Sequence, residues 1–571
     1  SITGEHGVGF DKRELLSLIF SEADMDAMLR VRAAFDPTGL CNPGKIIPML
    51  RGCGEARAIQ SPMSEPVADR GRQREPLVVT GTAGVPPASS TGFTRGKVEI
   101  LNPGYAAFKD TGRDAHGPSS SGARFHTGSP AFDPDAAKLQ LASITDENNI
   151  SALSSFPSSF IVSPNSIAEV CEVMKLATSE GWAVVPAGAM TWLDVGQPMK
   201  HVRLVISTRR MNRILEHEPA DLIAVTEAGV TLDGFNRALA KKGQWLPLDP
   251  PNDGRTTIGG VVATGLGGPQ QFGYGAPRRH VIGMKVVLAD GTLIKVGGRV
   301  VKNVAGYDLC KLFTGSYGTL GTIVEVNFKL RPLPFATSSL LVAGEREELL
   351  RIARLIIHSR LFPVAVELLS PAMARAAELT EKRQHMLLLK FDGSSTAVLQ
   401  QVARARELTS NCERSMTVAE DHHCWRRLAA LPSQFEKNLV WRVGLSPADI
   451  STFVATLDEH SSGAELFTLM WQAGVGDGRI RVIEQLQKQG ETDEIVRHAG
   501  KRLEQFRSEA ERRGGTLTVE QATTELKTQV SPWGNFGSAA GIMDRIKQQL
   551  DPHAILSPGR FGFETTRIDP N

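Results

Sequence analysis

The chain has 571 residues, 41% of them hydrophobic, and its 64 lysines and arginines nearly balance its 62 aspartates and glutamates. This length allows several domains, and a net charge of +2 does not favour nucleic acid as a partner. The six cysteines form no C-x-x-C pair, which argues against thiolate-held zinc or iron–sulfur and suits a reducing compartment. Without a long apolar run or a signal-peptide pattern, we expect a cytoplasmic protein with no transmembrane segment.

A segment near the N-terminus recurs near the C-terminus. Residues 21–35 carry apolar side chains at helical spacing and lead into a stretch from Asp36 to Lys45. The same stretch returns from Asp551 to Arg560, 515 positions later. The repeat indicates that one unit occurs twice, once within residues 1–50 and once near the C-terminus. The alternative is a fragment that packs weakly on the surface or is disordered.

Proline, glycine, serine and threonine dominate much of the next stretch, particularly at residues 85–92 and 117–122. Such a composition cannot bury enough apolar surface to order itself, so we expect a disordered linker over residues 51–150. A tail, a linker and a complete following subunit would result from the joining of two neighbouring coding regions.

Three glycine-rich turns then interrupt a series of short strands and helices. A capping box at Ser166 predicts a helix, and the strand that follows it runs into the first turn, residues 186–192. The second turn covers residues 250–265 and continues to 283, and the third covers residues 302–326. Between them, Asp290-Gly291 predicts a hairpin. Backbone N–H groups in turns of small residues can converge on a phosphate, so the pattern suits a large phosphate-bearing cofactor.

In this order and spacing, the three segments resemble the PCMH-type FAD-binding domain of the vanillyl-alcohol oxidase family, and most of all the FAD-binding subunits of bacterial glycolate oxidases. The G-x-G-x-x-G pattern of a nicotinamide site is not seen. The resemblance implies an α+β fold, with a two-subdomain PCMH-type FAD-binding domain over residues 151–334. An α+β cap domain with an antiparallel sheet follows over residues 335–571, where strand-like and helical runs alternate.

The resemblance also assigns a set of residues to the FAD. The first turn should wrap the pyrophosphate, and Gly321 and Ile323 should line the adenine end. The family usually has a glycine where this chain has Met190. The implied FAD-binding residues are Pro186, Ala187, Gly188, Ala189, Met190, Thr191, Trp192, Pro251, Thr257, Ile258, Gly259, Gly260, Ala263, Thr264, Val281, Ile282, Gly283, Gly321 and Ile323.

Four polar residues are further candidates near the flavin, because cations there can stabilise its anionic reduced form or hold a carboxylate. They are Lys302, Tyr307, Arg278 and Arg279. For each of them, solvated surface charge is the alternative.

Residues 1–50 resemble the end of the larger glycolate oxidase flavoprotein subunit, whose Gly-Glu-His-Gly motif matches Glu5 and His6. In that family the pair helps to hold a metal or to handle the substrate. At the repeat offset Glu5 aligns with Glu520 but His6 aligns with Gln521. Trp471 and Arg479 stand where the family's histidine-bearing Gly-Asp-Gly motif would place imidazoles. We therefore predict no metal site, and the catalytic residues stay unassigned.

The resemblance implies an FAD-dependent oxidoreductase acting on CH–OH donors. The resemblance points to an FAD-binding subunit of a glycolate (2-hydroxy acid) oxidase complex, in which a hydride passes to FAD and electrons move onward. Its partners would be the larger flavoprotein subunit and an iron–sulfur subunit, and any membrane association would be peripheral and through them. Two alternatives stay open: a stand-alone FAD oxidoreductase for another alcohol or hydroxy acid, and a non-catalytic flavin-binding assembly subunit.

Overall fold

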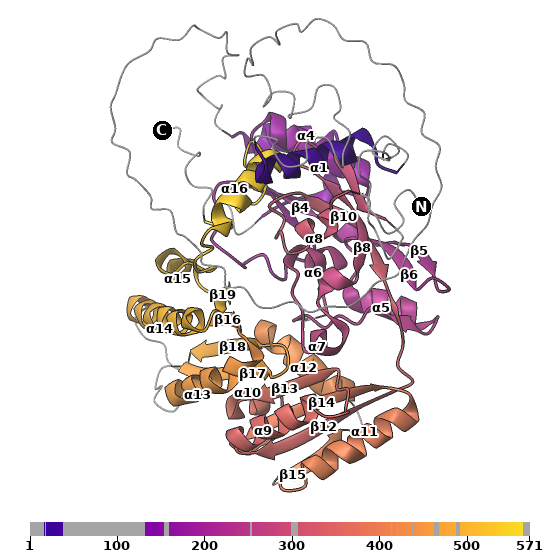
Figure 1. Cartoon of the computed structure of the whole chain (residues 1–571). Helices are drawn as coiled ribbons and strands as arrows, with labels where there is room; N and C mark the ends of the chain where they lie inside the picture. The colour runs from indigo at the N-terminus through magenta and orange to yellow at the C-terminus, as the bar shows by residue number, and fades with distance from the viewer. Residues whose placement is uncertain are drawn as a thin grey trace, which may run out of the picture. The chain divides into compact units, whose positions relative to one another are not determined.

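A computed structural model describes most of the chain outside the predicted linker (Figure 1). The described residues are 16, 19–37, 132–153, 159–251, 254–298, 306–412, 414–418, 421–434, 439–461, 467–486 and 492–562. Three predictions fall outside them: the roles of Glu5, His6 and Lys302. The same holds for residues 51–131 of the predicted linker. Within the described part, no helix is long and apolar enough to cross a membrane.

A four-stranded sheet of order β1-β2-β4-β3 opens the FAD-binding region, and its last three strands are parallel. Its elements are α3 (Pro134–Ala142), η2 (Glu147–Asn149), β1 (Ile150–Ala152), β2 (Phe160–Val162), α4 (Ile167–Ser179), β3 (Ala183–Ala187) and β4 (Val202–Ser207). The Ser166 hydroxyl accepts the Glu169 N–H at the start of α4, which confirms the predicted helix start. Helix α3 corrects the linker prediction, because Asp133 caps a helix with Pro134 in its first turn, inside the range 51–150.

A five-stranded antiparallel sheet of order β5-β6-β10-β8-β9 forms the second part of this region. Its strands are β5 (Ile214–Glu218), β6 (Ile223–Glu227), β8 (Val281–Val287), β9 (Leu293–Gly297) and β10 (Thr322–Lys329). The hairpin predicted at Asp290-Gly291 joins β8 to β9, and Gly291 takes the left-handed φ of +78° that the turn requires.

Short helices and one small ribbon lie between these strands. They are η3 (Thr208–Arg210), α5 (Leu232–Ala240), β7 (Gln244–Trp245), α6 (Ile258–Thr264), α7 (Gln271–Tyr274), η4 (Pro277–Arg279), α8 (Leu309–Phe313) and β11 (Arg331–Pro332), with β7 paired to β11.

The N-terminal helix α1 (Glu22–Phe35) belongs to the core of this same region. Ser21 and Asp24 form its capping box, and Met25, Met28 and Leu29 are buried. It lies beside α16 (Ala539–Leu550), the helix that carries the second copy of the repeat (Figure 1). The weakly packed or disordered fragment considered for the N-terminus is therefore wrong for this helix.

The C-terminal region is built on an eight-stranded antiparallel sheet of order β15-β12-β14-β13-β17-β18-β16-β19, as the predicted cap fold requires. Its strands are β12 (Ala336–Gly344), β13 (Ala365–Leu369), β14 (His385–Gly393), β15 (Arg414–Val418), β16 (Leu439–Gly444), β17 (Phe467–Gly474), β18 (Arg479–Leu486) and β19 (Thr516–Gln521). Its helices are α9 (Arg346–Ile357), α10 (Pro371–Ala376), α11 (Ser395–Leu408), α12 (Asp421–Gln434), η5 (Pro447–Asp449), α13 (Ile450–Ser461), α14 (Thr492–Arg512) and α15 (Thr524–Gln529).

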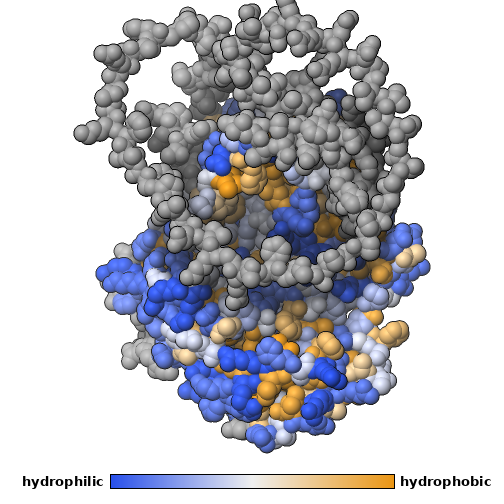
Figure 2. All heavy atoms as spheres, viewed as in Figure 1, coloured by the Kyte–Doolittle hydropathy of each residue, from blue (hydrophilic) through white to orange (hydrophobic). Residues whose placement is uncertain are grey.

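The two faces of this sheet differ in polarity. Helices α9, α11, α13 and α14 cover one face, where Leu389, Trp441 and Trp471 join a continuous apolar core. On the other face α10 and α12 cover a smaller apolar cluster, and the remainder carries charged side chains such as Lys390, Arg442 and Arg481. Figure 2 shows the outer surface over these elements, where hydrophobic residues alternate with hydrophilic ones.

The charged part of the sheet meets the FAD-binding region. Tyr274 Oη donates to Asp392 over 2.8 Å, and Gln271 Nε2 donates to Asp477 over 3.0 Å. A charged sheet face with its own polar partners across the boundary is suited to a site for a polar ligand rather than to a core.

Candidate functional site

The end of the chain reaches back to the first glycine-rich turn. Lys547 on α16 donates to the backbone oxygens of Thr319 and Leu556 and pairs with Asp551 over 2.5 Å. Asp551 in turn accepts the N–H groups of Ile555 and Leu556. This buried polar turn fixes the segment that follows α16.

That segment extends the four-stranded sheet beside β3. Val184 N–H donates to Ile555 O and Ser557 N–H donates to Val184 O, each over 2.7 Å. The pairing delivers Arg560 to the turn that follows β3, where its guanidinium donates to the backbone oxygens of Val195 and Leu193.

A recess lies where this turn, α6 and Arg560 meet. Its lining residues are Pro186, Ala187, Gly188, Ala189, Met190, Thr191, Trp192, Leu193, Thr257, Gly260, Ala263, Thr264, Tyr317 and Arg560. Small residues allow the backbone to approach a ligand closely here. A Cβ on Gly188 would lie 2.0 Å from Thr257 Oγ1, so only glycine fits at that position.

The backbone conformation at Met190 accounts for the glycine that the resembled family usually has at this position. Its φ is 62°, in the left-handed region that residues with a Cβ adopt only at a cost. The backbone path of the turn is thus the one a glycine would follow, with a methionine placed on it. The side chain packs against the apolar cluster of Val185, Val202 and Val205.

The structure brings together part of the predicted FAD-binding set. The whole first turn, 186–192, lines the recess with Thr257, Gly260, Ala263 and Thr264. The other predicted residues do not line it: Pro251, Ile258, Gly259, Val281, Ile282, Gly283, Gly321 and Ile323. Ile258 is wholly buried in the core, and Gly283 and Ile323 lie on the paired strands β8 and β10.

Tyr317 and Arg560 line the recess but were not among the residues expected from the sequence. Tyr317 takes a left-handed φ of 53° and packs edge-on against Trp533, with ring centroids 5.0 Å apart. Arg560 ends the repeated stretch, whose other copy also ends in a basic residue, Lys45. Both copies place a basic side chain directly after Pro-Gly. This pattern in the sequence could have identified Arg560 as a candidate for binding an anion.

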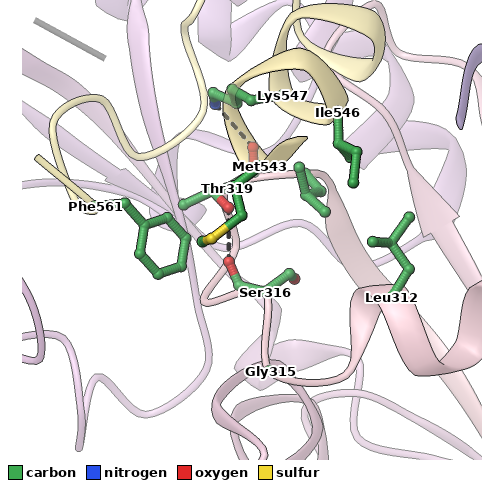
Figure 3. A pocket seen from close by; sticks show the side chains of 9 residues that line it. Leu312, Gly315, Ser316, Thr319, Met543, Ile546, Lys547 and Phe561 are labelled. Atoms are coloured by element: carbon green, nitrogen blue, oxygen red, sulfur yellow. Dashed lines mark hydrogen bonds between the residues drawn. The ribbon is translucent and has the colours of Figure 1, made fainter. Parts of the chain in front are cut away.

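The loop that carries Tyr317 also lines a second, mostly apolar cavity (Figure 3). Leu312, Ser316 and Thr319 line it from one part of the chain, and Met543 and Ile546 from α16. Lys547 and Thr319 hold this wall together through the hydrogen bond drawn in the figure. The position of the loop, and hence of Tyr317, therefore depends on α16.

A cationic group on the C-terminal sheet adjoins Tyr317. Arg481 forms two hydrogen bonds to Glu520, of 2.9 and 3.1 Å, and Arg442 lies 3.3 Å from the same carboxylate. Burial acts to raise the pKa of Glu520, but the two arginines outweigh it and hold that pKa below its usual range. Burial raises the pKa of the Tyr317 phenol, against the opposing charge of Arg442. Two arginines and one ionised glutamate leave an excess positive charge here.

A second charged group lies further along the same face. Arg479 Nη2 donates to Glu367 over 2.6 Å and lies 3.3 Å from Asp477, while its Nε and Nη1 have no hydrogen-bond partner among the described residues. Trp471, which the sequence placed with Arg479, lies on the opposite face of the sheet. Its indole donates to Asp458 and packs in the apolar core, because side chains alternate between faces along a strand.

The remaining polar candidates lie apart from the recess. Arg278 and Arg279 are exposed on η4, which agrees with the surface-charge alternative, and Tyr307 is half-buried. In the described part of the chain, no three histidine, cysteine, aspartate or glutamate side chains are grouped to hold a metal. Glu520, which aligns with Glu5 of the repeat, instead forms ion pairs with Arg481 and Arg442.

Two family models match the chain. The FAD binding domain matches residues 158–297, which include the recess turn and the β8–β9 hairpin. The C-terminal domain of the FAD linked oxidases matches two ranges, 1–46 and 335–561. The ends of these two ranges differ by the 515 positions of the repeat.

Curated relatives cover most of the chain at modest identity. Glycolate oxidase subunit GlcD of Bacillus subtilis is 27% identical over 71% of this chain and 89% of that protein. Glycolate oxidase subunit GlcE of Escherichia coli is 28% identical over 69% of this chain and 96% of that protein. D-2-hydroxyglutarate dehydrogenase of Xanthomonas citri pv. viticola is 27% identical over 71% of this chain and 89% of that protein.

Solved structures share the fold. p-Cresol methylhydroxylase matches with a TM-score of 0.60 at 16% identity, over 75% of this chain and 96% of that one. 4-Ethylphenol oxidase from Gulosibacter chungangensis matches with a TM-score of 0.58 at 17% identity, over 76% and 98%. These matches, with the family models, confirm the expected α+β fold of a PCMH-type FAD-binding domain and a cap.

Proposed function

Because the chain combines an FAD binding domain with the C-terminal domain of the FAD linked oxidases, and is thus an FAD-dependent oxidoreductase, we propose that it oxidises a small 2-hydroxy acid as the FAD-binding subunit of a glycolate oxidase type of complex. The observation that carries the proposal is the adjacency of the recess and the cationic group, which meet at Tyr317. The relatives that act on hydroxy acids support the substrate class.

The recess suits the pyrophosphate of FAD. Backbone N–H groups of the turn 186–192 and the Thr257 hydroxyl would surround it, and the absence of a side chain at Gly188 lets Thr257 lie directly against the turn. Arg560 supplies a fixed positive charge at its edge. When bound, FAD would supply the two-electron chemistry, as the acceptor of a hydride from the hydroxy acid.

The cationic group suits the carboxylate of the substrate. Arg481 is held in place by two hydrogen bonds to Glu520, so its charge is preorganised, and Arg442 stands on the neighbouring strand with its side chain partly exposed. Guanidinium groups recognise carboxylates in a planar, paired geometry. Their position on the sheet face that meets the FAD-binding region would orient a bound hydroxy acid toward the flavin.

One observation favours a second function, flavin-based electron transfer or assembly without substrate oxidation. The arginines depress the pKa of Glu520, and a carboxylate held in this way is a weak base for the substrate hydroxyl. In that case FAD in this chain would pass electrons while a partner subunit carries the hydroxy-acid chemistry.

Anaerobic titration of the purified chain with glycolate separates the two functions. We expect the visible flavin bands to bleach. Acid precipitation should release the flavin, because the first glycine-rich turn, 186–192, contains no histidine that could hold it covalently. The Arg442→Met variant should retain flavin but should need about 10- to 100-fold more glycolate for bleaching. This factor corresponds to the loss of one charge-assisted hydrogen bond to the substrate carboxylate. The control is Arg351→Met, which removes an exposed arginine paired with Glu348.

Flavin bands that stay unbleached at saturating glycolate would favour the electron-transfer function. A chain that purifies without any flavin, and does not take up added FAD, would contradict both. Equal glycolate requirements for the two arginine variants would remove Arg442 from the substrate site.

A further inference from the structure

We infer that the surface covered by α1, formed by α16, the strand β9 and Gly306, is a docking surface for the terminal helix of the C-terminal domain of a second FAD-linked oxidase chain. The proposal rests on the proposed function in one respect, that the chain works in a complex with a related flavoprotein. It names the place where that partner binds.

The first observation is that α1 and α16 are copies of one element. The C-terminal domain model matches residues 1–46 and again a range ending at 561, and the 515-position repeat aligns the two ends. Arg32 and Asp36 in the first copy pair at 3.9 Å, and the equivalent residues of the second copy, Lys547 and Asp551, pair at 2.5 Å. Helix α1 is therefore the terminal helix of such a domain, packed on this chain next to this chain's own terminal helix.

The second observation is that α1 is held by a mixed apolar and polar contact of the kind seen between subunits. Met28 Sδ lies against Gly306, where a Cβ would approach it to 2.6 Å, and Met28 shares a core with Ile546 and Leu550 of α16. Apolar burial of this kind supplies most of the affinity of a docked helix.

Polar contacts surround that apolar centre and set the position of the helix. The Lys295 N–H of β9 donates to Asp24, and Arg545 Nε of α16 donates to Ala34 O over 2.7 Å. Arg30 lies 3.5 Å from Asp290 in the turn before β9. A buried apolar centre with hydrogen bonds at its rim is the arrangement of a specific interface.

The test uses the whole chain with a protease recognition sequence inserted after Gly92. After complete cleavage, we expect the N-terminal fragment to co-elute with the remainder in size-exclusion chromatography at micromolar concentration. Met28→Asp should release it, whereas Phe35→Asp, which alters a residue 60% exposed on the same helix, should leave it bound. Arg545→Ala, on the docking surface itself, should weaken retention about tenfold, as loss of one hydrogen bond with a charged donor predicts.

The second half of the test supplies the helix from a separate molecule. A fluorescent peptide of residues 19–37 should bind the cleaved Met28→Asp protein, with a rise in anisotropy, and the same peptide carrying Met28→Asp should not. Loss of the wild-type fragment upon cleavage would overturn the proposal. So would a failure of the wild-type peptide to bind cleaved Met28→Asp protein that still retains its flavin.

The same samples keep this inference distinct from the proposed function. Retention of the fragment without bleaching by glycolate would remove only the hydroxy-acid chemistry. Bleaching with a released fragment would remove only the docking surface.

Discussion

Thr257 Oγ1 lies 2.0 Å from the point where a Cβ on Gly188 would stand. The same hydroxyl accepts the Gly260 N–H over 3.3 Å at the start of α6. This one oxygen atom therefore contacts both the first glycine-rich turn and α6, which line the recess together. A side chain at residue 188 must therefore displace Thr257.

Gly188→Ala should weaken FAD binding by about 10- to 100-fold, because overpacking at a fixed contact costs about 1–3 kcal/mol. Gly298→Ala is the matched control, since a Cβ there meets nothing within 4 Å. Flavin fluorescence quenching on titration of the deflavinated proteins measures both. Equal affinities would show that the turn does not touch the cofactor.

The left-handed backbone at Met190 makes a comparison of two small substitutions informative. Met190→Gly and Met190→Ala both remove the side chain, but alanine keeps the Cβ that the φ of 62° disfavours. We expect the glycine variant to be the more stable by about 1 kcal/mol. Urea unfolding followed by flavin release measures the difference, and an alanine variant of equal or greater stability would contradict the expected strain.

Lys547→Met should be among the most damaging single changes outside the recess. The side chains of Lys547 and Asp551 are 4% and 0% exposed, so the substitution leaves a buried carboxylate without its cation. Loss of one member of such a pair costs about 3–5 kcal/mol.

The same change should also loosen FAD, because Asp551 holds the segment that carries Arg560. Lys311→Met is the control, since its ion pair with Asp308 is about half exposed on both sides and contributes little. Thermal unfolding and flavin content check both variants. A Lys547→Met protein with unchanged flavin content would separate Arg560 from this turn.

Asp249 should make stability depend on pH in an unusual direction. Burial raises the pKa of this carboxyl to about 6, although a hydrogen bond from the Gln270 N–H and the charges of Arg479 and Lys390 oppose the rise. A raised pKa means that the folded state binds the proton more tightly, so stability is present at low pH and is lost as pH rises from about 4 to about 6.

Asp249→Asn should remove that loss. We expect the variant to exceed the wild type in stability by about 2 kcal/mol at pH 7 and to equal it at pH 4. The difference at pH 7 is smaller than the whole pKa shift would give, because the Asp249 side chain is only partly buried. Unfolding at both pH values measures this, with the exposed Asp221→Asn as control. The same difference at the two pH values would assign the effect to packing.

Local chemistry predicted much of the fold. The cap at Ser166 and the turn at Gly291 lie where the sequence placed them, because each depends on neighbouring residues alone. In the C-terminal domain, by contrast, strands β13, β16 and β18 were not predicted from the sequence. Their charged residues, such as Glu367 and Arg442, interrupt the apolar pattern because they face the FAD-binding region.

The sequence predicted the parts of the recess that two glycine-rich stretches supply, the turn 186–192 and residues within 257–264, and missed Tyr317 and Arg560. The turn 186–192 is contiguous, so its glycine-rich pattern was sufficient. Arg560 arrives through the pairing of Ile555 and Ser557 with Val184, and Tyr317 through a loop held by α16. Those relationships are tertiary, and no periodicity in the sequence records them.

The hydrogen bond from Lys295 to Asp24 has a consequence for solubility. Strand β9 is the outer strand of the five-stranded sheet, and edge strands with free N–H groups recruit strands from other molecules. With Asp24 as acceptor, α1 occupies one of those donors and shields that edge. A chain deprived of this helix would present an unprotected strand, and self-association through β9 is the form of aggregation to expect.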